Sequence, residues 1–225
     1  MSLFFWSCNK SFAASLGIWA DYERTGQENE PSSGPLLVVA NHQSNIDPPI
    51  VARSISHRTL FPAKRELFTI RLTNLLLRMW GAFPLTRGEP DASAYRKILS
   101  TLSKSKGCVT LFPEGTRTRG SMRKAQSGPA MIALRTGVTV LPIGITGTKD
   151  LNGVLRALNP IGTIRVRIGR PFKVVDRGVD RKEAVDGATE EIMGRIAELL
   201  PESFRGVYSD AAGAERKFTE DLPNA

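Results

Sequence analysis

The chain has 225 residues, of which 41% are hydrophobic, and this is enough to bury one substantial core in a single α/β domain. Lys and Arg total 31 against 22 Asp and Glu, so the formal net charge is +9. This charge predicts an anionic partner: nucleic acid, a phosphorylated ligand or acidic lipid headgroups. Cys8 and Cys108 lack any CxxC or metal-ligand spacing, so we expect a reduced compartment and inert thiols.

The N-terminal segment, residues 1–23, is apolar in patches, but no stretch reaches the roughly 18 apolar residues of a spanning helix. A secretory signal has a basic region before its apolar stretch, and no basic residue precedes the first aromatic cluster here. We therefore expect no secretory signal. Its large apolar side chains either form an interfacial membrane helix or dock on the domain core. They are Phe4, Phe5, Trp6, Phe12, Leu16, Ile18 and Trp19. We expect residues 1–30 to be an N-terminal interfacial segment followed by a loop.

Strand-like and helix-like segments alternate after the polar stretch 25–35. The expected strands are Leu36–Ala40, Thr59–Ala63, Ala82–Thr86, Cys108–Phe112 and Val138–Ile145. The expected helices are Pro48–Ser56, Leu67–Trp80, Asp91–Ser105 and Gly128–Thr136. This alternation predicts a largely parallel or mixed sheet with helices packed on both faces.

One more strand and one more helix are expected towards the C-terminus. Residues 163–172 alternate apolar residues with arginines, which predicts a strand with one wet face near a sheet edge. Asp180–Leu200 has the pattern of a capped amphipathic helix. We therefore expect one domain over residues 31–200 and a polar C-terminal tail over 201–225.

The stretch NHQSNID, residues 41–47, follows the first expected strand. One continuous helix would hold His42 and Asp47, five positions apart, roughly 140° from each other. A bend followed by a helix that starts near Asp47, with Pro48 just after it, can fold the imidazole back onto the carboxylate. Taken alone, the spacing favours the plainer alternative of a helix N-cap and a solvated turn histidine.

Polar residues also follow other expected strands, and ligands of open α/β sheets collect beyond the carboxyl ends of the strands. Arg87 follows one strand, and the sequence PEGTRTRG, residues 113–120, follows another. Arg87 and Arg117 suit a phosphate because a planar guanidinium donates two parallel hydrogen bonds, although a lone arginine is more often a solvated surface charge. Gly115 lets the backbone turn tightly or approach a ligand closely.

Several other chemistries are poorly supported. The sequence has no G-x-S-x-G motif, no G-x-x-x-x-G-K-[ST] phosphate loop and no H-E-x-x-H zinc pair. A metal site of His42, Asp47 and Glu114 would have only one nitrogen ligand, so we expect no metal. We expect no nucleic-acid partner either, because there is no basic strand with interleaved aromatic residues and no zinc-finger spacing.

The ordered blocks resemble those of the 1-acyl-sn-glycerol-3-phosphate acyltransferase family of glycerolipid synthesis, over roughly Asn41 to Gly147. NHQSNID matches the family's N-H-x-S-x-x-D block, Phe112–Arg117 matches F-P-E-G-T-R, and Leu141–Gly144 resembles its late V-P-apolar block. Ala63–Phe68 looks like the segment between the family's first two blocks. One departure is Thr86, because the family usually has an acidic residue before its arginine.

The resemblance implies an acyltransferase domain over 31–200 and a general-base mechanism. His42 takes the proton from the acceptor hydroxyl as its oxygen attacks a thioester, for which a pKa near 6.5 is suited. Asp47 holds the other ring nitrogen and stabilises the imidazolium. Because the nucleophile is the substrate's own hydroxyl, no enzyme serine is needed.

The resemblance also implies how the acceptor is bound: Glu114, Gly115, Thr116 and Arg117 contact its glycerol phosphate, with Arg87 as a further cation. The basic residues Arg119, Arg123 and Lys124 either meet phosphates or an acidic carrier protein, or form a solvated loop.

The expected reaction moves a fatty acyl group from acyl-coenzyme A or acyl carrier protein to a lysophosphatidic acid-like acceptor, giving phosphatidic acid, with no cofactor. Glycerol 3-phosphate or another lysophospholipid is an alternative acceptor. An alternative of another class is a non-catalytic protein that binds anionic membranes. For the enzyme we expect a peripheral location on the cytoplasmic face of a membrane, with its anionic surface as a partner.

Overall fold

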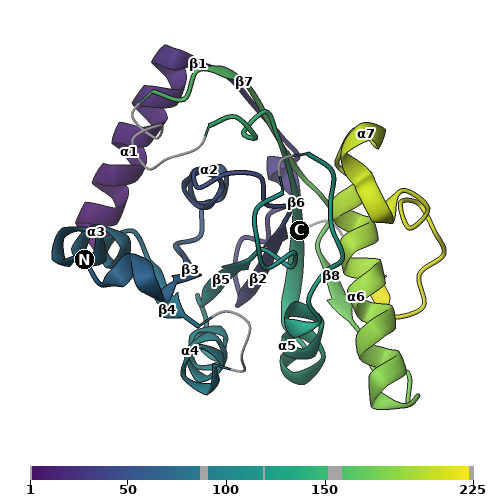
Figure 1. The fold of residues 1–225 in the computed structure, drawn as a ribbon. Coiled ribbons are helices and arrows are strands. Elements are labelled where there is room, and N and C mark those ends of the chain that lie inside the picture. The colour runs from purple at the N-terminus through teal and green to yellow at the C-terminus, as the bar shows by residue number, and fades with distance from the viewer. Residues whose placement is uncertain (1, 87–90, 119, 152–158, 223–225) are drawn as a thin grey trace.

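A nine-stranded mixed sheet runs through the part of the molecule that the structure describes (Figure 1). This structure is a computed structural model, and it describes residues 2–86, 91–118, 120–151 and 159–222. The strands are β1 (Ala20–Thr25), β2 (Leu36–Ala40), β3 (Thr59–Lys64), β4 (Ala82–Leu85), β5 (Cys108–Leu111), β6 (Thr139–Thr146), β7 (Gly162–Ile168), β8 (Phe172–Val174) and β9 (Thr219–Asp221).

Helices cover both faces of this sheet (Figure 1). The α-helices are α1 (Ser2–Trp19), α2 (Asp47–Ser54), α3 (Arg71–Met79), α4 (Ala92–Leu102), α5 (Gly128–Thr136), α6 (Arg181–Glu198) and α7 (Glu202–Arg205). Short 3-10 helices are η1 (Gln27–Asn29), η2 (Arg65–Phe68) and η4 (Gly206–Tyr208).

The strands follow the order β1-β7-β6-β2-β5-β3-β4. β2 pairs in parallel with β5 and β6, and β3 pairs in parallel with β4 and β5, whereas β7 and β8 run antiparallel to β6. The carboxyl ends of the central parallel strands therefore meet at one edge of the sheet, where ligands bind in such folds. The predicted α/β class, with a largely parallel or mixed sheet between helices, is confirmed.

The central strand β2 shows why two helical layers are needed. All five of its residues are buried. Leu37 and Val39 pack in the core cluster that includes α4, α5 and α6, while Leu36, Val38 and Ala40 pack in the cluster that includes α1 and α2. A strand that is apolar on both faces requires cover on both faces.

The N-terminal segment forms α1, which docks on the second of these clusters. Phe12 and Leu16 are buried there, so the docking alternative holds for them, whereas Trp6, Ile18 and Trp19 are exposed. Across the described residues, no helix is long and apolar enough to cross a membrane.

Strand β1 was not expected from the sequence, which predicted a loop around it. β1 pairs in parallel with β7, with Ala20 opposite Gly162, and its residues alternate between half-buried and exposed. Arg165 of β7 pairs with Asp21 and Glu23 of β1. β1 therefore forms the sheet edge and β7 lies one strand inside it, although the wet face of β7 is as predicted.

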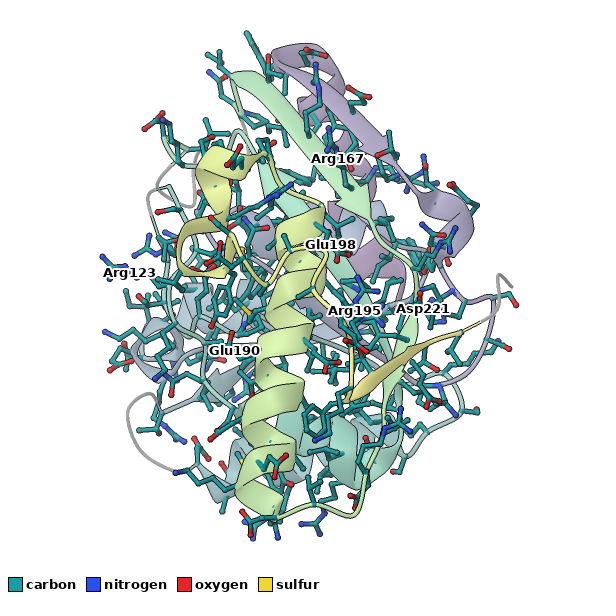
Figure 2. All side chains as sticks on the ribbon, turned by 90° about the vertical axis from the view of Figure 1, so that its right-hand side faces the viewer. Arg123, Arg167, Glu190, Arg195, Glu198 and Asp221 are labelled. Carbon is teal, nitrogen blue, oxygen red and sulfur yellow. The ribbon has the colours of Figure 1, made fainter. Side chains whose placement is uncertain are left out.

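The segment after residue 200, expected to be a polar tail, adds α7, η4 and β9 to the fold. Tyr208 and Phe218 are buried in the core, and β9 pairs with β8. Figure 2 shows Arg195 on α6 close to Asp221 at the end of β9, and the two form an ion pair. Two buried aromatic residues within a polar composition are too sparse to give a periodic pattern.

Candidate active site

The bend after β2 brings His42 and Asp47 together. The chain turns through residues 41–46, and α2 begins at Asp47 with Pro48 in its first turn. The imidazole Nδ1 of His42 lies 2.8 Å from Oδ2 of Asp47, and both residues are buried. The predicted pairing of these two side chains is what the geometry shows.

The carboxylate of Asp47 is held by several donors besides the imidazole. The backbone N–H groups of Gln43 and Ser44 each donate to Oδ2 over 2.6 Å. The hydroxyl of Thr148, just beyond β6, donates to Oδ1 over 2.7 Å. Asp47 has no exposed surface, and these bonds to protein groups fix its position.

This arrangement determines which ring nitrogen of His42 is available for chemistry. An oxygen that already accepts two N–H bonds requires a donor as its third partner, so Nδ1 carries the proton and Nε2 keeps its lone pair. Nε2 has no hydrogen-bond partner among the described residues. The ring stacks on Phe112, with centroids 4.3 Å apart and planes at 26°. The result is an oriented imidazole with a free basic nitrogen.

Glu114 lies beside His42, but its carboxylate binds backbone groups. Oε1 accepts from the N–H of His42 and Oε2 from the N–H of Arg123, each over 2.9 Å. Burial raises the pKa of Glu114 above its usual value, and these backbone bonds oppose that rise. Glu114 therefore clamps the loop after β5 to the bend after β2.

Gly115, Thr116 and Arg117 form the exposed part of the loop after β5. Gly115 has a φ of 67°, in the left-handed region that favours glycine, and its N–H donates to the carbonyl of Phe112 over 3.0 Å. Arg117 makes no ion pair with any residue in the described ranges. Its guanidinium is thus available for an anion from solution. Arg87, the other predicted cation, lies outside the described residues.

Thr86, the point of departure from the family pattern, has a defined role here. Its hydroxyl accepts from Nε of Arg65, and its N–H donates to Asp91, each over 2.9 Å. Asp91 also pairs with Arg65 at 3.2 Å, and bonds from Ser93 and other donors hold its pKa below the usual range. The threonine thus ties the end of β4 to η2.

Sequence reasoning assigned no role to Phe112, Thr148 or Asn41. The amide of Asn41 pairs with both backbone groups of Ile145, over 2.8 and 2.7 Å, and so joins the ends of β2 and β6. Thr148 follows β6 at the same sheet edge as His42. Its position just after an expected strand was the signal that could have identified it. Phe112 was inside a recognised block, but its ring contact depends on the fold.

The described side chains of the site offer few ligands for a metal ion. No cluster of three or more His, Cys, Asp or Glu side chains in the described parts of the chain is arranged to hold one. The other histidine, His57, bonds through Nδ1 to Glu30 over 2.7 Å and is not part of this site.

The structure thus places a buried His-Asp pair at the carboxyl edge of an α/β sheet, the edge at which such sheets bind their ligands. A family model described as Acyltransferase matches residues 21–146, which is more than half of the chain. The chain belongs to the acyltransferase family.

Individual relatives agree with this assignment. A crystal structure of the 1-acyl-sn-glycerophosphate acyltransferase from Thermotoga maritima matches with a TM-score of 0.65 and 31% identity, over 84% of this chain and 76% of that one. The chain is 29% identical to the 1-acyl-sn-glycerol-3-phosphate acyltransferase of Streptococcus pneumoniae, over 74% of this chain and 61% of the relative. It is 34% identical to the chloroplastic enzyme LPAT1 of Arabidopsis thaliana, over 71% of this chain and 46% of that relative. The chain spans about half to three fifths of the length of such relatives.

Proposed function

We propose that the chain transfers a fatty acyl group to the free hydroxyl of a 1-acyl-sn-glycerol 3-phosphate and so forms phosphatidic acid. The observation that carries the proposal is the 2.8 Å contact between Nδ1 of His42 and Asp47, which leaves Nε2 open beside the loop that presents Arg117. The names of relatives from bacteria and plants support the acceptor.

In the proposed reaction, Nε2 of His42 takes the proton of the acceptor hydroxyl while its oxygen attacks the thioester carbonyl. The tetrahedral intermediate then collapses, the carbon–sulfur bond breaks, and the imidazolium returns the proton to the leaving thiolate. Asp47 stabilises the imidazolium in between. Ser44 does not serve as a nucleophile, because its hydroxyl donates to the carbonyl of Leu151.

Arg117 and the hydroxyl of Thr116 are proposed to bind the acceptor phosphate, with Arg87 as a second cation and Gly115 shaping the turn. Glu114 contributes by clamping the loop, since its two oxygens already accept backbone bonds. Acyl-coenzyme A or acyl carrier protein is the proposed donor, and no cofactor takes part.

The proposed location is the cytoplasmic face of a membrane, where the chain binds peripherally. Both acceptor and product are lipids, and the net charge of +9 attracts anionic headgroups. The exposed Trp6 and Trp19 of α1 suit headgroup depth.

The test is thiol release from oleoyl-coenzyme A with and without lysophosphatidic acid, followed by lipid mass spectrometry. We expect release that depends on the acceptor, with phosphatidic acid as product. His42→Ala should lower turnover by about a hundredfold to ten-thousandfold and leave the fold intact, because it removes the base.

Other outcomes contradict the proposal in distinct ways. Acceptor-independent release identifies a thioesterase, and no release with any acceptor identifies a binding protein. If the protein prefers glycerol 3-phosphate or another lysophospholipid, the proposed acyl transfer is correct and the proposed acceptor is wrong.

A further inference from the structure

Helix α3 turns a row of leucines towards solvent. None of its residues is buried, and Leu72, Leu75 and Leu76 are 66, 57 and 47% exposed. Because these positions are three and four apart, the three side chains form one stripe along the helix. Just before the helix, Leu67 and Ile70 are exposed as well. We name these five residues the α3 surface.

The side of α3 that faces the protein carries polar as well as apolar residues. The half-buried residues of the helix are Thr73, Asn74, Leu77 and Met79, and Leu77 packs on a small cluster that includes Phe61 and Phe68. An amphipathic helix of a globular domain normally points its apolar stripe at the core. In α3 the three most exposed leucines lie on the solvent side instead, so the described part of the protein leaves much of their apolar surface uncovered.

The α3 surface begins at the edge of the sheet where the candidate active site lies. β3 is parallel to β5, which is parallel to β2, and η2 and α3 follow the carboxyl end of β3. Figure 1 shows α3 on the outside of the molecule, on the face that α1 and α2 cover. The ring of Phe12 on α1 packs edge-on against Trp80 at the end of α3, with centroids 6.0 Å apart.

Basic side chains flank the leucine stripe. Arg71 and Arg78 are seven positions apart, so they lie on the same flank of the helix. Arg71 forms no ion pair with a described residue, and Arg78 bonds to Asn74 and lies over the ring of Phe68. Of the four Lys and Arg in residues 64–80, Lys64 pairs with Glu66 and Arg65 pairs with Asp91, so Arg71 and Arg78 supply the positive charge beside the stripe. This surface is apolar with a cationic rim.

We propose that the α3 surface inserts into the interface of an anionic lipid bilayer. At about 1.5 Å per residue, a nine-residue helix is far too short to span a bilayer, so it lies in the plane of the interface. Its leucines reach the acyl boundary, and Arg71 and Arg78 reach the phosphates.

A second copy of the chain fits the α3 surface less well. A stable protein interface takes about 20–30 residues from each partner, and the α3 surface offers five. Two copies meeting through this face would also bring Arg71 and Arg78 towards their own equivalents. A bilayer, by contrast, rewards each apolar side chain that enters it and supplies the anions.

Insertion places the sheet edge with His42 against the lipid, so an acceptor reaches the site without leaving the membrane. Only this consequence rests on the proposed function. Binding of the α3 surface to lipid stands on the exposed leucines and the charges alone.

The test compares Leu72→Ser/Leu75→Ser/Leu76→Ser with the wild type in sedimentation with vesicles of phosphatidylcholine and phosphatidylglycerol. We expect the bound-to-free ratio to fall by about tenfold or more, because the stripe supplies the apolar contact. Arg71→Gln should lower binding by about fivefold on these vesicles and leave binding to pure phosphatidylcholine unchanged. The matched control is Val207→Ser, which removes a side chain that is 68% exposed on η4 and should have no effect.

A second measurement keeps the test decisive if the triple variant folds poorly. Leu75→Trp should show a blue-shifted emission and added quenching by lipids brominated in their acyl chains, and Val207→Trp should show neither. Wild-type vesicle binding by a folded triple variant, or no added quenching of Leu75→Trp, overturns the proposal. A wild-type dimer that the serine substitutions dissociate overturns it as well.

Activity separates this inference from the proposed function. The triple variant should keep wild-type turnover of a short-chain soluble lysophosphatidic acid while losing turnover of a vesicle-embedded one. If the wild type acylates no acceptor but the leucine variant still loses vesicle binding, the proposed function fails and the lipid-binding surface stands.

Discussion

Asp47 and Glu114 are two buried carboxylates in the same site, and both accept backbone N–H bonds, but of the two only Asp47 also bonds to an ionisable side chain in the described part of the chain. Asp47 accepts from a side chain that can change its protonation state, the imidazole of His42. Glu114 accepts from backbone N–H groups of two loops. The acids of the two sequence blocks therefore differ, since Asp47 orients the imidazole of His42, the proposed base, and Glu114 joins the loops on either side of it.

Among the substitutions that test this comparison, the largest effect is expected for Asp47→Asn. An amide accepts through only one of its two polar atoms and carries no charge, so it neither stabilises the imidazolium nor secures the tautomer. We expect turnover to fall by about a hundredfold or more, with the acceptor KM changed little. Steady-state kinetics measure both. Unchanged turnover would leave Asp47 with only the structural task of holding the bend at Gln43 and Ser44, and it would remove the contrast with Glu114.

Arg117→Ala tests whether the loop after β5, which Glu114 holds in place, binds the acceptor phosphate through Arg117. A charge-assisted contact to a phosphate contributes about 1.5–3 kcal/mol, so the acceptor KM should rise roughly tenfold to a hundredfold. Arg181→Ala is a matched control, because it removes another exposed arginine, at the first position of α6 beside the end of α5 and outside the loops that carry the site. A raised donor KM with a constant acceptor KM would move Arg117 to the donor site.

Thr148→Val removes the hydroxyl that donates to Oδ1 of Asp47 and keeps the shape of the side chain. We expect turnover to fall by about tenfold with the acceptor KM unchanged, because a bond to a charged group contributes about 1.5–3 kcal/mol. Thr148→Ser, which keeps the hydroxyl, should retain wild-type turnover. Unchanged turnover in Thr148→Val would show that this hydrogen bond does not contribute to catalysis.

Glu114→Gln should change turnover least and stability most. Its NH2 group would face a backbone N–H donor, which costs about 1–3 kcal/mol of unfolding free energy. Because burial raises the pKa of Glu114, the native state binds this proton more tightly than the unfolded state. The contribution of Glu114 to stability therefore falls as pH rises above 4.5, towards the raised value.

Urea unfolding of the wild type and Glu114→Gln at several pH values above 4.5 checks the direction of this pH dependence. The stability difference between the two proteins should shift in favour of the variant as pH rises. A pH-independent difference would show that Glu114 titrates as an ordinary carboxyl.

The sequence was sufficient for the parts of the site that lie close together in the chain. His42 and Asp47 are joined by one bend, and the residues after β2 and β5 could be placed at one edge because both strands are apolar and parallel. Thr148 lies 101 positions from Asp47, and its hydrogen bond depends on how β6 sits beside β2. No local pattern encodes such a pairing.

The same limit explains the missed strand and the boundaries of α3. β1 has few large apolar residues, so its sequence does not predict a strand. It is one because it pairs with β7, which is more than a hundred positions away in the chain. The predicted helix Leu67–Trp80 is divided into η2 and α3 by an extended Ile70. The sequence predicted a helix over this segment, but not the break at Ile70 or which side of the helix would face the protein.

The orientation of Ser44 towards Leu151 has a kinetic consequence. Burial raises the pKa of the Cys108 thiol to about 12, so this residue is not a nucleophile either. With no covalent carrier for the acyl group among these side chains, the proposed transfer needs both substrates bound at once. Initial-rate plots for the two substrates should therefore intersect rather than run parallel, and mixing with donor alone should give no burst of free thiol.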